Sequence, residues 1–439
     1  TRFRNVTGVQ TCALPIYVGH LVADADDGED KIEREAKKEK IDPLRVAERF
    51  TDMYLKDETA LHILEPLDRP RASAYVKEML AIIQTLTERG HTYETDDGIY
   101  FRVESFDRYG MLSGNTLEKI SAGARVSVDE KKEHPADFAL WKKCVGHNAQ
   151  HILRWSMATG DRVHTIGEDS NAGFPGWHIE CSAMSSALLG EQIDIHTGGE
   201  DNIFPHHECE IAQSECAFQK TFVRMWLHKR RIDLQGEKMS KSLGNVLSID
   251  DIIAKGYSPL DFRYAVLTVH YRTNMKFSWD SMKQARTARI SIVEWMKNPV
   301  ATHESQEQKS PDVSTIKACH QKFVDCMNSD LNTSGAIASV FECMHHVSGC
   351  TNSNSEVEAA VLPFVEMIKH TFGCFEDDGV TEASLDISSD VQALLNERSA
   401  ARASKNFKRS DELRDQILEL GFIIDDQKTG EQKLRKRLY

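Results

Sequence analysis

The chain has 439 residues, and its 54 Lys and Arg against 68 Asp and Glu give a formal net charge of −14. Hydrophobic residues make up 40% and charged residues 28%, which is enough apolar material for a core and excludes a disordered chain. At about 150 residues per domain, this length predicts roughly three domains. We find neither an apolar run long enough for a membrane span nor a basic segment followed by an apolar core, so we expect a cytoplasmic protein.

Cysteine usage and net charge bear on metals and partners. The ten cysteines are scattered rather than set in a short, regular framework, which predicts reduced thiols, a few of which can bind metal. The acidic total argues against a nucleic-acid coat over the whole surface. A local basic face stays open, because binding follows the distribution of charge rather than its sum.

The head of the chain stands apart from the rest. Residues 6–16 read VTGVQTCALPI and fit neither helix nor strand periodicity. They resemble the translation of a common DNA sequencing-library adaptor, so we interpret residues 1–16 as a non-native or disordered head and leave them out of the fold. An irregular N-terminal arm is the alternative, and the underlying DNA sequence distinguishes the two.

Helical periodicity dominates residues 31–90. Two amphipathic runs lie around residues 47–61 and 74–86. Gly90 follows the second run and is expected to act as its C-cap, because glycine readily takes the left-handed conformation that ends many helices.

A hairpin and a long polar stretch follow. Residues 94–103 alternate around Asp97 and Gly98, which predicts a β-hairpin. From there to about residue 170 the chain is polar and rich in turns, and we interpret this stretch as an insertion between two halves of a sheet domain.

Helix and strand patterns alternate quickly between residues 173 and 223. They predict a helix over residues 177–188, a strand over residues 192–196, a Gly-Gly turn and a helix over residues 205–217. This alternation is typical of α/β architecture with a parallel sheet. Ligands of such sheets bind at the carboxyl ends of the strands.

The pattern turns helical after about residue 281. Two polar linkers interrupt it, at residues 298–312 and 376–390. The last segment predicts a helix from Val391 and a second helix from Ser410 to Gly421, followed by a strand-turn-strand. In that second helix, Leu413, Ile417 and Leu420 share one face and form an apolar stripe.

The sharpest chemical signal is the run Lys238, Met239, Ser240, Lys241 and Ser242. Two lysines three residues apart, with small hydroxyl side chains between and beside them, can wrap a triphosphate and neutralise the charge that grows during attack at phosphorus. A solvated Lys/Ser loop without function is the alternative.

A second cluster has the composition of a metal site. His206 and Glu210 are four residues apart on a predicted helix, so their side chains lie on one face. Cys181 lies in the first turns of another helix, where the helix dipole favours a thiolate. Thiolate, imidazole and carboxylate together suit Zn²⁺. The alternative is that His206 lines or caps a helix and that Cys181 is a small buried hydrophobe.

Both signals occur inside a longer similarity. The run at residues 238–242 resembles the signature loop of class I aminoacyl-tRNA synthetases, and the chain from about Val18 to Tyr439 resembles cysteinyl-tRNA synthetases. The segments that carry this resemblance most clearly are residues 24–31, 123–125, 137–141, 173–184, 194–199, 204–213, 270–272 and 328–332.

The resemblance implies a Rossmann-type class I catalytic domain with an insertion, followed by a helical bundle and a small α/β C-terminal domain. We therefore expect this division: a head at residues 1–16, the first and incomplete part of the catalytic domain at 17–90, a connective insertion at 91–170, the second part of the catalytic domain at 171–228, a signature-loop and stem-contact region at 229–290, a tRNA-binding helical bundle at 291–378, and an anticodon-side domain at 386–439.

The resemblance also implies roles for individual residues. Lys238 and Lys241 would be catalytic and would bind ATP together with Met239, Ser240, Ser242, Gly198 and Gly199. Trp177 and His196 would line the pocket for the substrate cysteine. Cys181, His206 and Glu210 would hold one zinc ion.

The implied reaction has two steps. Cysteine attacks the α-phosphate of ATP, which is bound with Mg²⁺, and a ribose hydroxyl of the cysteine tRNA then attacks the resulting adenylate. Zinc would bind the cysteine thiolate and reject serine, so no editing domain is needed. The expected partners are cysteine tRNA, L-cysteine and ATP, with no membrane, and the expected state is a monomer.

The sequence departs from the family near its start. Class I synthetases carry a His-x-Gly-His box, and the closest run here is Tyr17-Val18-Gly19-His20, which we do not accept as that box. Cys12 lies within the adaptor-like stretch, so we do not offer it as the fourth zinc ligand. We expect a chain truncated at its N-terminus, which binds zinc weakly and activates cysteine poorly.

Two other functions stay open. One is the paralogous ligase that joins cysteine to an amino-sugar in thiol biosynthesis, which lacks the full anticodon-side region. The other is a non-catalytic tRNA-binding relative. The basic run at residues 433–437 fits contact with RNA phosphates, although a solvated charged end is the alternative.

Overall fold

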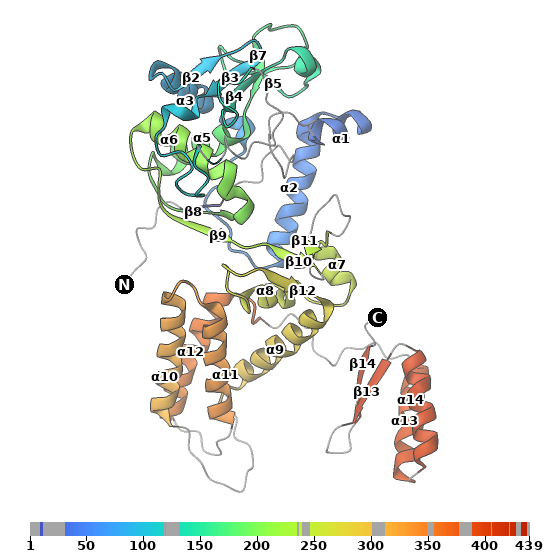
Figure 1. Cartoon of the computed structure of the whole chain (residues 1–439). Helices are drawn as coiled ribbons and strands as arrows, with labels where there is room; N and C mark the ends of the chain where they lie inside the picture. The colour runs from blue at the N-terminus through green and yellow to red at the C-terminus, as the bar shows by residue number, and fades with distance from the viewer. Residues whose placement is uncertain are drawn as a thin grey trace. The chain divides into compact units, whose positions relative to one another are not determined.

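The computed structural model divides the chain into two compact units (Figure 1). Unit 1 comprises Thr1–Thr59, Ile63–Lys238 and Tyr271–Lys276, and unit 2 comprises Ala60–His62, Met239–His270 and Phe277–Tyr439. The residues that the structure describes are 9–11, 31–117, 119, 131–234, 237–238, 246–300, 312–348, 355–376, 389–404, 406–420, 422–426 and 432–436. Among the described helices, none combines the length and the apolar character that crossing a membrane requires.

The first helices of the chain are α1 (Lys31–Glu39), α2 (Pro43–Ala60) and α3 (Val76–Glu88), the last preceded by the short helix η1 (Ala72–Ala74). The helical prediction for this segment is confirmed. Gly90 follows α3 with φ of 80°, and its N–H donates to the carbonyl of Thr87 over 3.0 Å. The N–H of His91 donates to the carbonyl of Leu86 over 3.0 Å, which completes a Schellman motif.

A six-stranded antiparallel sheet follows, in the order β2-β3-β4-β7-β5-β6. Its strands are β2 (Thr92–Glu94), β3 (Gly98–Phe101), β4 (Phe138–Lys143), β5 (Arg154–Ser156), β6 (Arg162–Val163) and β7 (Ala172–Pro175), and the short helices η2 (Val103–Ser105) and η3 (Gly146–Gln150) lie between them. The predicted hairpin at residues 94–103 is confirmed as β2 and β3.

The polar, turn-rich description of the stretch before residue 170 is wrong for β4. This strand lies inside the sheet, and its side chains from Phe138 to Lys142 are all at most 4% exposed. A strand that is buried on both faces has no polar alternation, so periodicity does not reveal it.

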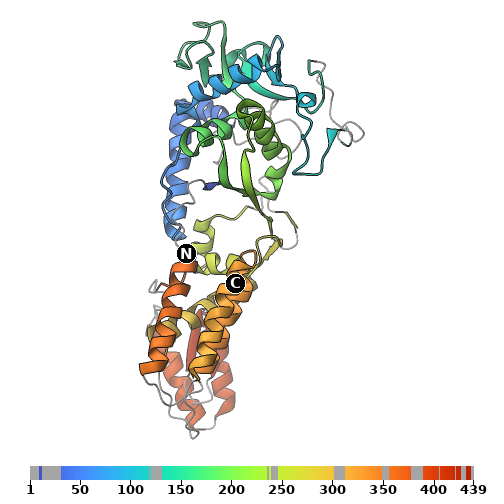
Figure 2. The ribbon, with the colours of Figure 1, turned by 90° about the vertical axis from the view of Figure 1, so that its left-hand side faces the viewer.

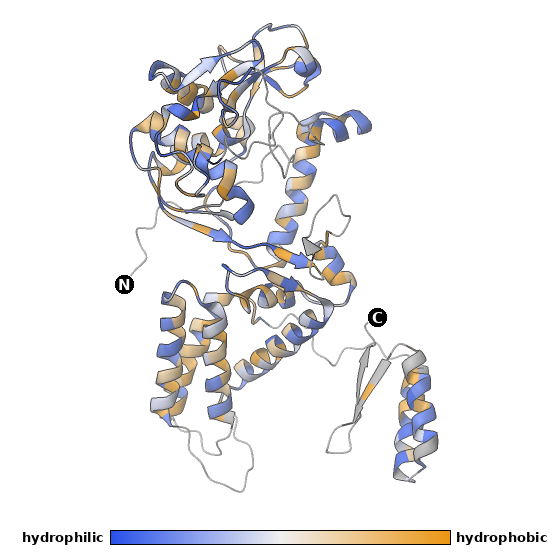
Figure 3. Ribbon diagram, viewed as in Figure 1, coloured by the Kyte–Doolittle hydropathy of each residue, from blue (hydrophilic) through white to orange (hydrophobic). Residues whose placement is uncertain are grey.

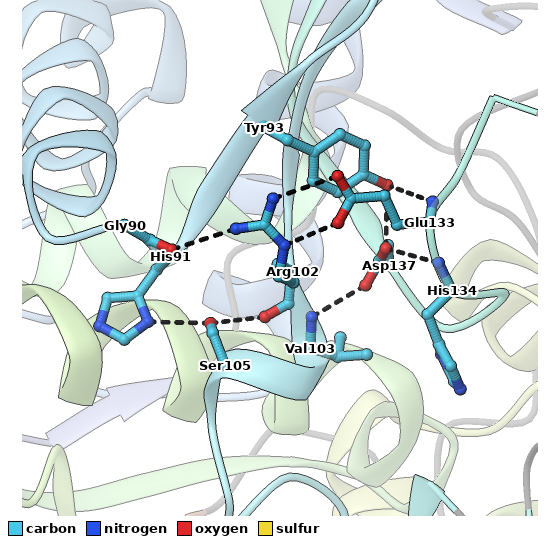
Figure 4. Close-up of polar contacts among 9 residues, drawn as sticks. All are labelled: Gly90, His91, Tyr93, Arg102, Val103, Ser105, Glu133, His134 and Asp137. Atoms are coloured by element: carbon cyan, nitrogen blue, oxygen red, sulfur yellow. Dashed lines mark hydrogen bonds and ion pairs between the residues drawn. The ribbon is translucent and has the colours of Figure 1, made fainter.

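A buried carboxylate attaches the start of β4 to the hairpin (Figure 4). Asp137 is 2% exposed, and its Oδ1 accepts the N–H of Val103 over 2.8 Å. Its Oδ2 accepts the N–H of His134 over 2.8 Å and the hydroxyl of Tyr93 over 2.9 Å. Burial raises the pKa of Asp137 even though these three donors favour the carboxylate. We call this group the Asp137 cluster.

The second sheet of unit 1 is parallel, as predicted. Strand β8 (Ile193–Gly199) pairs in parallel with β9 (Val223–Lys229) and, on its other side, with β1 (Val9–Thr11). Figures 1 and 2 both draw β8 and β9 side by side. The expectation of no regular structure in residues 6–16 is therefore wrong for residues 9–11.

The helices beside this sheet are α5 (Trp177–Leu189) and α6 (Glu208–Phe218). The predicted start of α6 at Pro205 is wrong, because η4 (Glu200–Asn202) and the π-helical turn η5 (Ile203–His207) come first. Phe204 has extended φ and ψ of −137° and 131°, the conformation that a following proline favours. Gly198 and Gly199 end β8 instead of forming a separate turn.

A third sheet has the order β11-β10-β12, with β10 (Ile232–Leu234), β11 (Glu237–Lys238) and β12 (Met275–Phe277).

Unit 2 is mainly helical, as predicted. Its first helices, α7 (Ile249–Ala254) and α8 (Pro259–Leu267), each begin with a capping box. The helices α9 (Trp279–Lys297), α10 (Val313–Asn328), α11 (Thr333–Ser348) and α12 (Ser355–Phe372) follow. Figure 3 shows both hydrophobic and hydrophilic colours on each of these four helices. Most of the two predicted linkers lies outside the described residues.

The last segment contains α13 (Ser389–Ala403), α14 (Phe407–Glu419) and an antiparallel pair, β13 (Phe422–Asp426) and β14 (Gln432–Lys436). The strand-turn-strand is confirmed, but the start of the second helix at Ser410 is wrong. The side chain of Asn406 accepts the N–H of Arg409 over 3.2 Å and so caps the helix earlier. Leu413 and Ile417 are fully buried as expected, whereas Leu420 is 51% exposed because it follows the helix end. Gly421 lies outside the described residues.

Candidate active site

The three predicted metal ligands meet in the interior of unit 1. Cys181 comes from α5, His206 from η5 and Glu210 from α6, and their ligand atoms all lie within 4.8 Å of one another. All three residues are at most 2% exposed. The His206 Nε2 and the Glu210 Oε1 are 2.7 Å apart. We call these three residues the Cys-His-Glu cluster.

A second group shares the carboxylate of this cluster. The ligand atoms of His196, His207 and Glu210 also lie within 4.8 Å of one another, and all three side chains are buried. The His196 Nε2 is 3.4 Å from the Glu210 Oε2. The two carboxylate oxygens of Glu210 therefore face different imidazoles.

The structure adds histidines that the sequence analysis did not assign. The Nδ1 of His178 lies 2.8 Å from the Nδ1 of His206, and the Nδ1 of His207 lies 2.9 Å from the Nε2 of His228. Five of the chain's 18 histidines fall between positions 178 and 228, and this local enrichment was the available signal. Because His178 engages the Nδ1 of His206, the Nε2 of His206 is the nitrogen that faces the cluster.

The donor set of the Cys-His-Glu cluster fits zinc. Thiolate, imidazole and carboxylate are its usual protein ligands, and the hydrogen bond between His178 and His206 orients the imidazole, as partners of ligating histidines commonly do. Two nearby cysteines lie outside the cluster. The Sγ of Cys209 is 3.5 Å from the hydroxyl of Tyr109, and burial raises the pKa of Cys216 to about 12, which keeps it a thiol.

Trp177 lies against the cluster. Its ring stacks on the ring of His206 with a centroid distance of 4.3 Å and an interplanar angle of 22°. Its Nε1 is buried and has no hydrogen-bond partner among the residues that the structure describes. A donor of this kind can serve an acceptor on a bound ligand. His196, the other residue expected in the substrate pocket, is fully buried and packs on Trp226 at 4.6 Å.

A cavity of about 640 Å³ opens at the carboxyl ends of β8 and β9. Gly198 and Gly199 line it for different reasons. A Cβ on Gly198 would lie 2.6 Å from the Cε1 of His207, so any other residue there would displace the His207 ring. A Cβ on Gly199 would meet no described atom within 4 Å, so that position borders open space. The other lining residues are Thr197, Glu200, Asp201, Asn202, Leu227, Lys229, Arg230, Arg231, Ile232 and Tyr271.

The cavity carries several charges. Burial would raise the pKa of Glu200, but a side-chain hydrogen bond from Arg230 and a 3.1 Å backbone hydrogen bond from Arg231 lower it overall. Burial lowers the pKa of Lys229. Basic side chains beside a strand end suit an anionic ligand.

Most of the predicted signature loop lies outside the described residues. Lys238 ends β11, but its side chain lies outside the described part of the chain. The remaining members of the loop, Met239, Ser240, Lys241 and Ser242, also lie outside the described residues.

Comparison with known proteins identifies three domain families in this chain. The profile of the tRNA synthetases class I (C) catalytic domain matches residues 13–287, the DALR domain matches residues 322–376, and the cysteinyl-tRNA ligase anticodon binding domain matches residues 385–435. The cysteine-tRNA ligase of Chlorobaculum tepidum is 38% identical over 424 residues, which cover 94% of this chain and 83% of the relative. That of Thermus thermophilus is 38% identical over 423 residues, covering 94% of this chain and 84% of the relative. The chain therefore belongs to the cysteinyl-tRNA synthetase family.

Proposed function

We propose that this chain catalyses the ATP-dependent ligation of cysteine to its cognate tRNA through a cysteinyl adenylate. One observation carries the proposal: Cys181, His206 and Glu210 converge within 4.8 Å in the core of unit 1. Gly198 borders the cavity and lies directly against His207, whose group shares Glu210 with this cluster. The proposed metal centre would thus lie close to the cavity that would hold the nucleotide.

The Cys-His-Glu cluster would hold one zinc ion. When bound there, Zn²⁺ supplies a soft Lewis acid that holds a thiolate far more strongly than the hydroxyl of serine. Trp177 would donate its Nε1–H to the bound amino acid, and His196 would form the buried wall of the same pocket. Selection by a specific contact of this kind can reach about 10⁴-fold, so no second editing site is required.

The cavity at the ends of β8 and β9 would receive ATP with Mg²⁺. Gly198 and Gly199 would allow the nucleotide to approach the backbone closely. Lys238 and Lys241 would place their ammonium groups on the phosphates, with Met239, Ser240 and Ser242 completing the loop. Such lysines act by positioning and by stabilising charge that develops at the transferred group.

The tRNA would contact the helical and C-terminal parts of the chain. The proposed domain division assigns residues 291–378 to a tRNA-binding bundle and residues 386–439 to an anticodon-side domain, and the two C-terminal profile matches support this assignment. The monomeric state and the cytoplasmic location stay predictions.

A charging assay tests the proposal. Purified chain is mixed with cysteine, ATP and cysteine tRNA, with the enzyme in excess over tRNA so that even one slow turnover is detected. We expect cysteinyl-tRNA to form and seryl-tRNA to be absent. Transfer of cysteine to an amino-sugar instead of tRNA would favour the paralogous ligase. Binding of tRNA without cysteine-dependent ATP–pyrophosphate exchange would favour a non-catalytic relative.

A further inference from the structure

Glu208 is a buried carboxylate outside the Cys-His-Glu cluster. It is 1% exposed and opens the first turn of α6. Its Oε2 accepts the N–H of Gly110 over 3.0 Å, and its Oε1 accepts the N–H of Ser113 over 2.6 Å. A buried charge is costly unless strong hydrogen bonds compensate it, so these two amides largely explain why Glu208 points inward.

The loop that supplies these amides contacts α6 at two further positions. The hydroxyl of Tyr109 lies 3.5 Å from the Sγ of Cys209, and Arg108 pairs with Glu215 over 2.9 Å. We call residues 108–113 the amide loop. Gly110 has φ of 87°, and a Cβ there would lie 2.1 Å from the carbonyl oxygen of Asn115, so glycine is required for the loop's shape.

Glu208 lies between two proposed metal ligands in the sequence. Residues two apart on an α-helix are separated by about 200° around its axis, so Glu208 and Glu210 point to opposite sides of α6. The ligand side faces His206, whose Nε2 is 2.7 Å from Glu210, and the other side faces the amide loop. The rotation of this first turn about the helix axis is thus held from both sides.

We propose that Glu208 is a positioning residue for the metal centre. By binding the amides of Gly110 and Ser113, it sets the orientation of the first turn of α6, and with it the place of His206 and Glu210. The inference rests on the proposed function, because it assumes that these two residues bind metal. Glu208 itself touches neither metal nor substrate.

Titration with Co²⁺ tests this role directly. Cobalt is a spectroscopic substitute for zinc, and a thiolate ligand gives it a charge-transfer band. We expect the unaltered chain to show this band. Glu208→Gln keeps the shape but places an amide N–H against the loop's N–H groups, so we expect the same band with an affinity reduced about 10- to 100-fold, as for other outer-shell partners of metal ligands.

A matched variant separates positioning from general stability. Arg108→Gln removes a loop contact at the far end of α6, where the arginine side chain is 56% exposed. We expect this variant to bind Co²⁺ within about twofold of the unaltered chain, because the first turn keeps both amide contacts. Both variants are titrated well below their melting temperatures, so a stability change alone does not alter the affinity.

Three results would be decisive. Glu208→Gln binding Co²⁺ within twofold of the unaltered chain would overturn the positioning role and leave the metal centre standing. An equal loss of Co²⁺ affinity in Arg108→Gln would also overturn this role, because the loss of any contact between the loop and α6 would then weaken metal binding to the same extent. Absence of the charge-transfer band in the unaltered chain would instead overturn the metal centre and the inference together.

Hydrogen exchange tests the same coupling without a variant, in case Glu208→Gln does not fold. Coupling between two sites is reciprocal, so metal binding must in turn stabilise the amide loop. We expect zinc to slow exchange in residues 108–113 by about fivefold or more, together with residues 206–210. Slower exchange at residues 206–210 with no change in the amide loop would overturn the inference.

Discussion

Two buried polar groups of unit 1, the Asp137 cluster and the Cys-His-Glu cluster, differ in the kinds of atoms that they bring together. In the Asp137 cluster, one carboxylate accepts hydrogen bonds from the N–H groups of Val103 and His134 and from the hydroxyl of Tyr93 (Figure 4). In the Cys-His-Glu cluster, one ligand atom each from a thiol, an imidazole and a carboxylate lie within 4.8 Å of one another. The first group surrounds one acceptor with donors, and the second brings together three side chains that can each bind a metal ion.

This difference separates a structural role from a binding role. A buried acceptor surrounded by donors stabilises the fold and needs no ligand. Side chains of this kind brought close together can bind a cation between them, which is why such groups mark metal sites. Changes in the Cys-His-Glu cluster should therefore reduce function more than stability, and changes in the Asp137 cluster should do the reverse.

The largest effect is expected from Glu210→Gln. We expect kcat/KM for cysteine-dependent ATP–pyrophosphate exchange to fall about 10²- to 10³-fold, equivalent to about 3–4 kcal/mol of transition-state stabilisation. The metal-free variant should unfold with a free energy within about 1 kcal/mol of the unaltered chain, because glutamine keeps the shape and an acceptor. Glu215→Gln, on the same helix, is the control and should keep its activity. A Glu210→Gln variant with activity within tenfold would contradict the distinction.

Asp137→Ala should act on stability instead. It leaves the buried N–H of Val103 and the half-buried N–H of His134 without their acceptor, so we expect the free energy of unfolding to fall by about 3 kcal/mol in urea titrations. Zinc affinity should change by less than about twofold. The control is Asp107→Ala, since Asp107 is exposed. A loss of zinc affinity comparable with that of Glu210→Gln would show that the Asp137 cluster does not have a purely structural role.

A third buried carboxylate, Glu33, adds a pH test. It is 3% exposed, accepts N–H groups of Ile152 and Leu153 and lies 2.9 Å from His151. Burial would raise its pKa, but the contacts with His151 and the two amides lower it from 4.5 to about 2. Its contribution to stability is therefore complete above pH 4.5 and is lost as the pH falls toward 2.

We expect Glu33→Gln to cost about 2 kcal/mol at pH 7 and to flatten the pH dependence of stability in this window. Urea midpoints at pH 5 and pH 2.5 measure the change for both proteins. A Glu33→Gln variant that loses as much stability on acidification as the unaltered chain would show that other carboxylates govern this window.

The smallest effect is expected at the rim of the Asp137 cluster. Arg102 makes two contacts with Glu133, at 2.7 and 3.1 Å, but the Glu133 side chain is 50% exposed. Glu133→Gln should therefore cost about 0.5 kcal/mol or less, and the difference should vanish in 1 M salt because solvent ions screen the pair. A salt-independent loss above about 1 kcal/mol would place Glu133 within the buried network.

Features encoded by neighbouring residues could be predicted from the sequence. The end of α3 at Gly90, the β2–β3 hairpin and the parallel pairing of β8 follow from periodicity and turn residues. Strand β4 could not be recognised, because its burial on both faces removes the alternation that identifies a strand. The start of α6 was displaced because Pro205 shapes the turn before it.

The candidate site divides in the same way. Helical spacing brings His206 and Glu210 together, but Cys181 joins them only through the packing of α5 against α6, and family resemblance supplied that link. The contacts of His206 with His178 and of Glu208 with the amide loop join residues far apart in the sequence. No local pattern encodes such pairs.

X-ray absorption at the zinc K-edge tests the central claim most directly. The chain is loaded with one equivalent of zinc and measured without and with L-cysteine. We expect the zinc ion to have one sulfur neighbour at about 2.3 Å, supplied by Cys181, and nitrogen and oxygen neighbours at about 2.0–2.1 Å, supplied by His206 and Glu210. A second sulfur neighbour should appear when cysteine is added. A first shell of nitrogen and oxygen alone, unchanged by cysteine, would contradict the assignment.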